Sequence, residues 1–475
     1  MPLKNNKIET VLKEVLKRVK PSPERRKEIL ELAEKVKSKV RKELKKANLK
    51  AEVRVEGSVA KDTWLSENPD IDIFVRFPPN FPREKFRTTF LQVAKKATEG
   101  AQHVERFAEH PYLEAIINSN RINIVPCYAT KPKEWKSATD RTPYHTDYVR
   151  KHLTEKLCDE VRLLKKFMQG IEVYGAEIKV GGFSGYLCEL LTLKYRNFIQ
   201  VLENFAKWKG KLVIDLENYY KGREDDLNLM FKESLIVVDP VDESRNVAAA
   251  VQRDHLYEFI AASRQFLKSP SLKFFYPSET APLTREELVK SIRKRKTTIV
   301  FLKLGCVEAV PDILWGQIYK SQRSLRKLFK QYEFELIRDA VWSDEKNIIM
   351  MIFEFEAGKL PHVKKHFGPP LEKQVECEKF LSKHLLSKSS FSGPYIEDGR
   401  WIVETKRKYF DVVRLLKEKL HDGGKNSGVA ELVAEGIRRQ FKIFVNEEIM
   451  EFYVSNVDFA KFLTDYLDGR PKWLR

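Results

Sequence analysis

The 475-residue sequence has few cysteines, no long apolar run and no internal repeat or low-complexity segment. Its five cysteines form no CxxC spacing, which argues against a zinc site or a disulfide framework and is typical of reduced core residues. No apolar run approaches the roughly 18 residues of a spanning helix, and the first residues lack the apolar core of a signal peptide. We therefore expect a soluble, cytoplasmic protein with no membrane partner.

Acidic residues are outnumbered: 68 Asp and Glu stand against 87 Lys and Arg, a formal net charge of +19. An excess of this size favours a polyanionic partner, with nucleic acid ahead of a membrane surface. The length predicts about three domains. We place them at residues 1–150, 151–262 and 263–475, and the composition leaves the oligomeric state open, a homodimer included.

The most informative stretch runs from residue 54 to 77. Alternating apolar residues predict a strand, a Gly57-Ser58 turn and a second strand that carries Asp70 and Asp72. The two aspartates share one face of that strand, with Cα atoms about 6.5 Å apart, which suits one or two divalent ions. The turn can hold a phosphate beside them. Taken alone, the pair also fits a strand with two solvated aspartates.

A helix at 82–100 and strands at 103–108, 112–117 and 121–128 complete a small α/β unit. Two-metal sites usually draw a third carboxylate from a neighbouring strand, and the corresponding position here is Asn123. An amide can ligate through its oxygen, but it brings no negative charge and cannot accept a proton.

Further candidates follow in the middle of the chain. Thr142 and His145 lie in a polar stretch that we expect to be a loop, where a phosphate or ribose contact competes with a structural histidine. Lys165 lies on a predicted amphipathic helix. It is a candidate site residue, and the alternative is an ordinary lysine in solvent. Arg245 stands where a strand is expected to enter a helix, and it could read a base edge or form a buried salt bridge.

The C-terminal part is predicted to be an α+β unit. A strand at 297–304, a helix at 313–332 and two strands near 334–342 and 347–357 suggest a ferredoxin-like fold, which is compatible with RNA binding. Lys273 in a basic aromatic loop at 270–277 and the Arg400-Trp401 pair are candidate RNA contacts, although a core tryptophan is equally compatible. The glycine-rich stretch at 421–428 is no Walker A loop, because Asn426 follows Lys425.

Several of these stretches together resemble one family, the archaeal-type class I CCA-adding enzymes, which are tRNA nucleotidyltransferases. The resemblance spans residues 50–402 in order. Its motifs are VEGSVAKDTWL, DIDIFVRFP, INIVPCY, DRTPYHT, EVRLLK, YGAEIKVGGFSGYLCELL, VVDPVDESRNVAAAV, PSLKFF and GPYIEDGRW. It implies an α+β multidomain chain with a polymerase-β-like nucleotidyltransferase head, a helical neck, a body and a tail. It also implies template-independent addition of C, C and A to the tRNA 3′ end from CTP and ATP, with Mg2+.

The resemblance carries residue roles with it. It implies that Asp70 and Asp72 hold metal and that Arg245 helps to recognise the incoming base. The triphosphate contacts that it implies are Gly57, Ser58, Lys61, His145, Lys165 and Tyr174.

Asn123 departs from the family pattern, which places a third carboxylate at this position. A positioned base contributes about 10²- to 10⁴-fold in rate, so three outcomes are open. The chain is a slowed enzyme, a neighbour such as Glu114 substitutes, or the chain is a silent tRNA-binding paralogue. A related nucleotidyltransferase of the poly(A) or oligoadenylate type is a further alternative.

Overall fold

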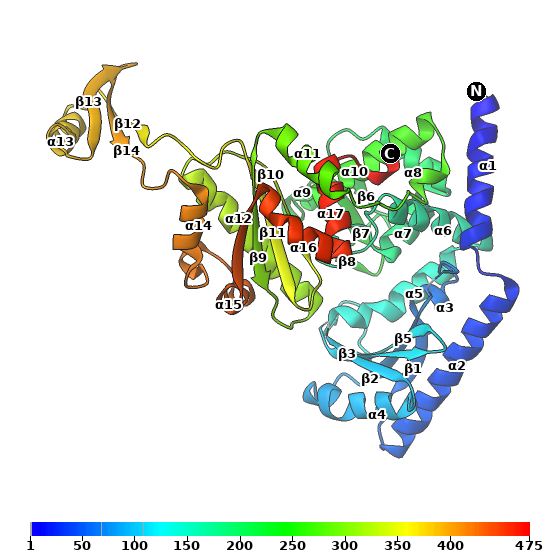
Figure 1. Ribbon diagram of the computed structural model, residues 1–475. Helices are drawn as coiled ribbons and strands as arrows, with labels where there is room; N and C mark the ends of the chain where they lie inside the picture. The colour runs from blue at the N-terminus through cyan, green and yellow to red at the C-terminus, as the bar shows by residue number, and fades with distance from the viewer. Residues whose placement is uncertain (1, 68, 108) are drawn as a thin grey trace. The chain divides into compact units, whose positions relative to one another are not determined.

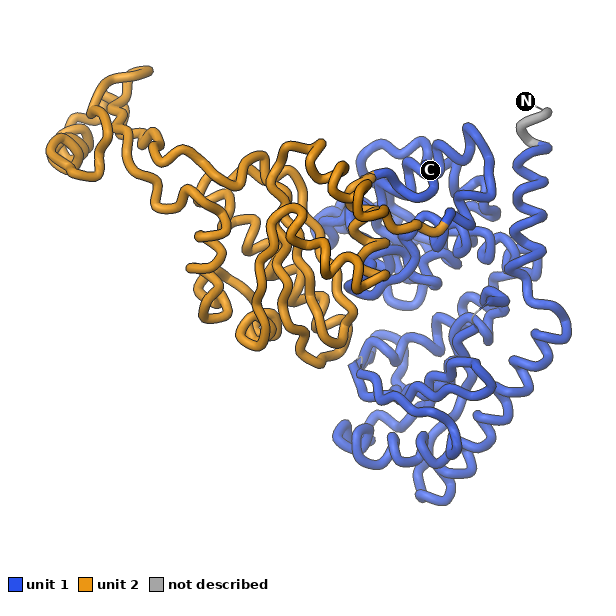
Figure 2. Tube along the Cα trace, in the orientation of Figure 1, with its two compact units in different colours: residues 1–278, 470–475 blue, residues 279–469 orange. Residues whose placement is uncertain are grey.

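The computed structural model describes residues 2–67, 69–107 and 109–475. The chain divides into two compact units, which Figure 2 distinguishes by colour. Unit 1 comprises residues 1–278 and 470–475, and unit 2 comprises residues 279–469. The finer division into three domains, with boundaries at 150 and 262, stays a prediction. No helix in the described part of the chain has the length and apolar character needed to span a bilayer.

Unit 1 contains a five-stranded sheet in the order β1-β2-β5-β4-β3. Its strands are β1 (Glu52–Glu56), β2 (Asp70–Phe77), β3 (Gln102–Phe107), β4 (Pro111–Ile117) and β5 (Asn120–Tyr128). β2 and β5 run parallel, and the other neighbours are antiparallel. The strands predicted for this region are confirmed, except that Ala108, the last residue of one of them, lies outside the described residues.

Helix α2 (Pro23–Lys46) covers this sheet (Figure 1). Ser22 caps the helix by accepting a hydrogen bond from the Arg25 N–H, and Pro23 occupies the first turn, where a missing N–H is harmless. The inner face of α2, which includes Ile29 and Val40, shares a core with Ile71 and Ile73 of β2. Burial of Ile71 and Ile73 on this face leaves Asp70 and Asp72, which alternate with them along β2, on the opposite face of the sheet.

A helical region completes unit 1, with a second core rich in phenylalanine. Its helices and short strands, together with the short helices of the sheet region, are α1 (Pro2–Val19), α3 (Gly57–Ala60), α4 (Leu91–Ala97), α5 (Thr142–His152), α6 (Glu155–Gly170), α7 (Gly185–Tyr195), α8 (Phe198–Ala206), β6 (Leu212–Ile214), α9 (Glu224–Met230), β7 (Leu235–Asp239), β8 (Asp242–Asn246) and α10 (Arg253–Lys268). Phe274 and Phe275 of the predicted basic aromatic loop are 2% and 1% exposed in this core. The aromatic part of that loop therefore packs inward.

Two local predictions in this region are wrong. The stretch that holds Thr142 and His145 is a helix, α5, because Pro143 suits its first turn and Val149 is buried on its inner face. Arg245 lies on strand β8, because the Asp239 carboxylate accepts a hydrogen bond from the Val241 N–H and closes a tight turn between β7 and β8.

Unit 2 contains a four-stranded antiparallel sheet in the order β10-β11-β9-β15. With helices α12 and α15, the chain order is strand, helix, two strands, helix, strand, which is the ferredoxin-like arrangement that the sequence predicted. A three-stranded sheet, β12-β14-β13, is inserted after β11 and carries helix α13. The elements of unit 2 are α11 (Arg285–Arg295), β9 (Thr298–Gly305), α12 (Pro311–Gln331), β10 (Leu336–Ser343), β11 (Ile348–Phe355), β12 (Val363–Pro370), α13 (Gln374–His384), β13 (Ser390–Glu397), β14 (Arg400–Lys406), α14 (Val412–Leu420), α15 (Glu431–Arg439), β15 (Phe441–Val445), α16 (Met450–Ser455) and α17 (Val457–Asp468).

Candidate active site

Asp70 and Asp72 share one face of β2, and a row of polar side chains continues from Asp72 across the sheet. Asp72 pairs in register with Asn123 on β5, and Asn123 pairs with Glu114 on β4. The Asn123 amide donates a hydrogen bond of 2.9 Å to Asp72 Oδ1. The structure therefore confirms the prediction that Asn123 lies on a strand next to the one that carries Asp70 and Asp72.

Glu114 is 9% exposed and is held by arginines. Arg106 donates to its carboxylate from Nη2 at 3.1 Å. The Nε atom of Arg121 lies 3.9 Å from Glu114 Oε2 and 3.6 Å from Asp70 Oδ1. One guanidinium therefore stands between the carboxylates of β2 and β4.

Gly57 lies directly against the Asp72 carboxylate. Its φ is +70°, and a Cβ atom added there would stand 2.1 Å from Asp72 Oδ2. Only glycine combines this left-handed backbone with such a close approach. Ser58 follows as the second residue of α3.

The carboxylates of β2 are in surroundings that disfavour their charge. Burial raises the pKa of Asp72 to about 6, although the hydrogen bond from Asn123 opposes the shift. Burial also raises the pKa of Asp70, against the nearby Arg121. The described residues contain no group of three or more His, Cys, Asp or Glu side chains placed to hold a metal. Two carboxylates and an amide oxygen still make a hard-oxygen donor set, which fits a divalent cation of the Mg2+ type.

A second cluster surrounds Glu189 on α7, a residue that the sequence reasoning missed. Lys61 Nζ lies 2.6 Å from Glu189 Oε2, and Lys165 Nζ lies 3.4 Å from Oε1 and 3.0 Å from the Thr63 carbonyl. All three charged groups are buried. Burial opposes ionisation of Glu189, but the two lysines outweigh it and lower the pKa of this carboxyl. A lone glutamate in the apolar helix YLCELLTL was the signal that could have revealed this partner.

Lys165 is thus not a solvated lysine. Its side chain is 3% exposed, and burial lowers the pKa of its ammonium group. Tyr174 comes close to the same cluster, since a Cβ atom added at Gly185 would meet its hydroxyl at 3.0 Å and Lys165 Nζ at 3.5 Å. Burial raises the Tyr174 pKa, which keeps its hydroxyl neutral.

A third cluster surrounds Asp239 at the end of β7. His145 Nε2 and Arg245 Nη1 lie 2.9 Å and 2.8 Å from Asp239 Oδ2, and the Tyr186 hydroxyl donates to Oδ1 at 3.1 Å. Burial would raise the pKa of Asp239, but the hydrogen bonds and charges of His145 and Arg245 lower it to about 2. Burial lowers the pKa of His145.

Tyr186 connects the second and third clusters. Its ring stacks on His145 with centroids 4.0 Å apart, and Lys61 Nζ lies 5.7 Å from the same ring centroid. The structure therefore brings Lys61, Lys165 and Tyr174 together around Glu189, and His145 and Arg245 together around Asp239. Thr142 opens α5, one helical turn before Thr146.

The candidate RNA contacts lie in separate units. Lys273 belongs to a short 3₁₀ helix of unit 1, Leu272–Phe274, and is half-buried. Arg400 and Trp401 begin β14 of unit 2, where Trp401 is half-buried and pairs with Ile396 of β13. Trp401 is thus neither fully in a core nor fully in solvent.

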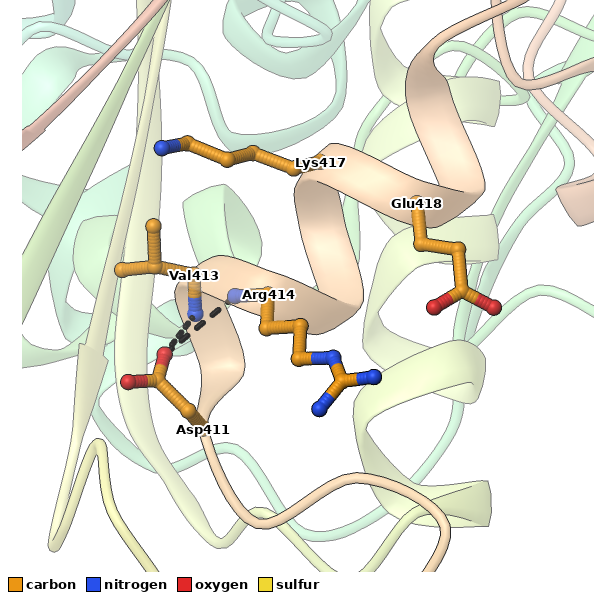
Figure 3. A pocket seen from close by; sticks show the side chains of 5 residues that line it. All are labelled: Asp411, Val413, Arg414, Lys417 and Glu418. Atoms are coloured by element: carbon orange, nitrogen blue, oxygen red, sulfur yellow. Dashed lines mark hydrogen bonds between the residues drawn. The ribbon is translucent and has the colours of Figure 1, made fainter.

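Figure 3 shows a surface hollow of about 490 Å³ at the start of α14 in unit 2. It is lined by Asp411, Val413, Arg414, Lys417 and Glu418. The Asp411 carboxylate accepts hydrogen bonds from the N–H groups of Val413 and Arg414, so this hollow surrounds an ordinary helix cap. It contains none of the candidate site residues.

Comparison with known proteins finds relatives for nearly the whole chain. Three family models match in order: a nucleotidyltransferase domain at residues 37–145, the second domain of tRNA nucleotidyltransferase at 159–276, and the C-terminal domain of CCA-adding enzymes at 295–446. A CCA-adding enzyme of Methanosarcina barkeri is 36% identical over 456 residues, which is 95% of this chain and 97% of that protein. One of Methanothermobacter thermautotrophicus is 32% identical over 462 residues, with 96% and 97% covered.

Among solved structures, the Cid1 poly(U) polymerase with Mg and 3′-dATP bound has a TM-score of 0.42 at 18% identity, covering 55% of this chain and 94% of that one. The assignment depends on the relatives that match nearly from end to end. The chain belongs to the family of CCA-adding enzymes.

Proposed function

We propose that this chain adds C, C and A to the 3′ end of tRNA from CTP and ATP, without a template and with release of pyrophosphate. The observation that carries the proposal is the identity of 36% over 95% of the chain with a relative named CCA-adding enzyme. Nothing in the comparisons favours a silent paralogue. The basic charge of +19 suits a tRNA partner, whose phosphates it would attract.

Asp70 and Asp72 are the proposed holders of Mg2+. Their oxygens share one face of β2, and Gly57 leaves room for the Asp72 carboxylate. A divalent cation held there would offset the negative charge of the triphosphate and would lower the pKa of the attacking hydroxyl. The Asn123 amide would keep the Asp72 carboxylate oriented through its hydrogen bond.

Several of the proposed nucleotide contacts are side chains that the buried carboxylates of Glu189 and Asp239 hold in place. Lys61 and Lys165 are fixed by Glu189, and the surplus positive charge of this trio suits a triphosphate. Arg245 is 35% exposed while it contacts Asp239, so part of its guanidinium remains available to a base edge. The other proposed nucleotide contacts are Gly57, Ser58, Thr142, His145 and Tyr174. Lys273, Arg400 and Trp401 are the proposed tRNA contacts.

The test is incorporation of labelled CMP and then AMP into tRNA that lacks its CCA end, with Mg2+. We expect ordered addition of C, C and A, and no addition from UTP or GTP. Asp72→Asn, which removes a proposed metal ligand, is the inactive control. Incorporation of AMP alone in long runs would indicate a poly(A)-type enzyme, and tRNA binding without any incorporation would indicate a silent paralogue.

A further inference from the structure

Asn123 supplies no third carboxylate, but a carboxylate lies beside it on the next strand. Glu114 on β4 is the antiparallel partner of Asn123, which in turn is the parallel partner of Asp72. Registered partners point to the same face of a sheet, with Cβ atoms about 5 Å apart. Asp72, Asn123 and Glu114 therefore follow one another on the face that carries the proposed site.

We propose that Glu114 supplies the third carboxylate of this site, in place of Asn123. The inference rests on the proposed function. Glu114 would accept the proton of the tRNA 3′-hydroxyl as that oxygen bonds to the α-phosphorus of the nucleotide. The bond from this phosphorus to the bridging oxygen breaks at the same time, and pyrophosphate leaves with that electron pair.

Glu114 is hydrogen-bonded to Arg106 of β3, and a second arginine, Arg121 of β5, links it to β2. Arg121 Nε lies 3.9 Å from Glu114 and 3.6 Å from Asp70, so both carboxylates face the same guanidinium. A glutamate side chain is one methylene longer than an aspartate, which partly compensates for its position one strand further away. Glu114 is also 9% exposed, so a hydroxyl that reaches it loses most of its water.

Glu114 can exchange its contact with Arg106 for a contact with a bound cation or substrate. Arg106 donates to it at 3.1 Å, but the Arg106 side chain is 40% exposed. Water can solvate this exposed guanidinium when the pair opens, whereas the nearly buried Glu114 needs another partner. We therefore expect Glu114 to leave Arg106 only when a bound cation or the substrate hydroxyl replaces the guanidinium.

Glu56 is the other carboxylate in the row, and it is a poorer candidate. It pairs with Asp72 from β1, on the side opposite Asn123. Its side chain has no exposed surface and lies 2.7 Å from Arg54 Nε. A proton acceptor must reach a substrate hydroxyl, and the fully buried Glu56 offers no surface for that contact, so the position on β4 is the better one.

The test compares the chain with Glu114→Gln, Asn123→Asp and the double variant. Single-turnover CMP incorporation is measured across a pH range, and Mn2+ binding is titrated by electron paramagnetic resonance without nucleotide. We expect Glu114→Gln to slow incorporation by about 10²- to 10⁴-fold and to weaken Mn2+ binding. Asn123→Asp should restore both in the Glu114→Gln background, because it returns a carboxylate to the same face.

The matched control is Glu105→Gln. Glu105 lies on β3, pairs in register with Leu113 and so points to the opposite face from Glu114. It is half exposed and contacts Lys95. This change should leave incorporation and Mn2+ binding as they are in the unaltered chain.

The outcomes separate the inference from the proposed function. Full incorporation by Glu114→Gln, or a loss that Asn123→Asp does not rescue although Asn123→Asp alone is active, overturns the role of Glu114. Activity that first appears in Asn123→Asp overturns the role of Glu114 and also the proposed function of this chain, which would then be a silent paralogue of an active scaffold. If all four proteins bind tRNA and none incorporates CMP, the proposed function fails.

Discussion

The close approach of Gly57 to Asp72 gives a sharp test of the candidate metal site. In Gly57→Ala the new methyl group would stand 2.1 Å from Asp72 Oδ2 and 3.0 Å from its Cγ, well inside contact distance. The carboxylate must therefore move by about 1 Å, and a displacement of that size at a reacting centre costs about 10²-fold in rate. The left-handed φ of +70° adds a strain of about 1–2 kcal/mol for alanine.

Gly100→Ala separates these two effects. Gly100 has a φ of +86°, but a Cβ atom there meets nothing within 4 Å. Thermal unfolding should show a similar small loss of stability in both variants. The kcat/KM for CMP incorporation should fall about 10²-fold in Gly57→Ala only. A Gly57→Ala variant as active as Gly100→Ala would refute the inference that the Asp72 carboxylate must stay where it is.

Three further predictions follow from the buried charges and the proposed metal. Glu189→Ala should lower the free energy of unfolding by about 3–5 kcal/mol, because Lys61 and Lys165 lose their buried partner; a loss below 1 kcal/mol in urea denaturation would contradict this. Asp239, with a pKa lowered to about 2, should contribute about 2 kcal/mol of stability above pH 4 that disappears as the pH falls toward 2. Asp239→Asn should therefore flatten the acid side of the stability curve, and an unchanged curve would count against the ion pairs. Removal of divalent metal with EDTA should abolish incorporation, added Mg2+ should restore it, and tRNA binding measured by filter retention should persist.

Local patterns in the sequence were enough to predict the strand that carries Asp70 and Asp72. Its alternating apolar residues and the glycine before it depend only on neighbours in the chain. The neighbouring-strand position of Asn123 and the ferredoxin-like order of unit 2 followed from similar patterns. The family resemblance added Lys61 and Tyr174 to the candidates, and the roles of all the candidate residues stay predictions.

Contacts between distant segments were beyond reach of the sequence. The pairing of Glu114 with Asn123 depends on strand register, which a shift by one residue would reverse. Glu189 and Lys61 are 128 residues apart in the chain, so the burial of Lys165 beside them had no local signal. Periodicity likewise left His145 in a loop, because the short polar helix α5 shows few apolar positions before Val149.

The two buried carboxylates suggest how a protein could select a base without a template. Glu189 holds Lys61 and Lys165, Asp239 holds His145 and Arg245, all at distances of 2.6 to 3.4 Å, and the Tyr186 ring contacts both sets. Side chains fixed in this way lose little further entropy when a nucleotide binds. A guanidinium held on one side by Asp239 presents its remaining donors in a defined direction. We infer that these fixed donors of the protein recognise the incoming base, a task that a template strand performs in other polymerases.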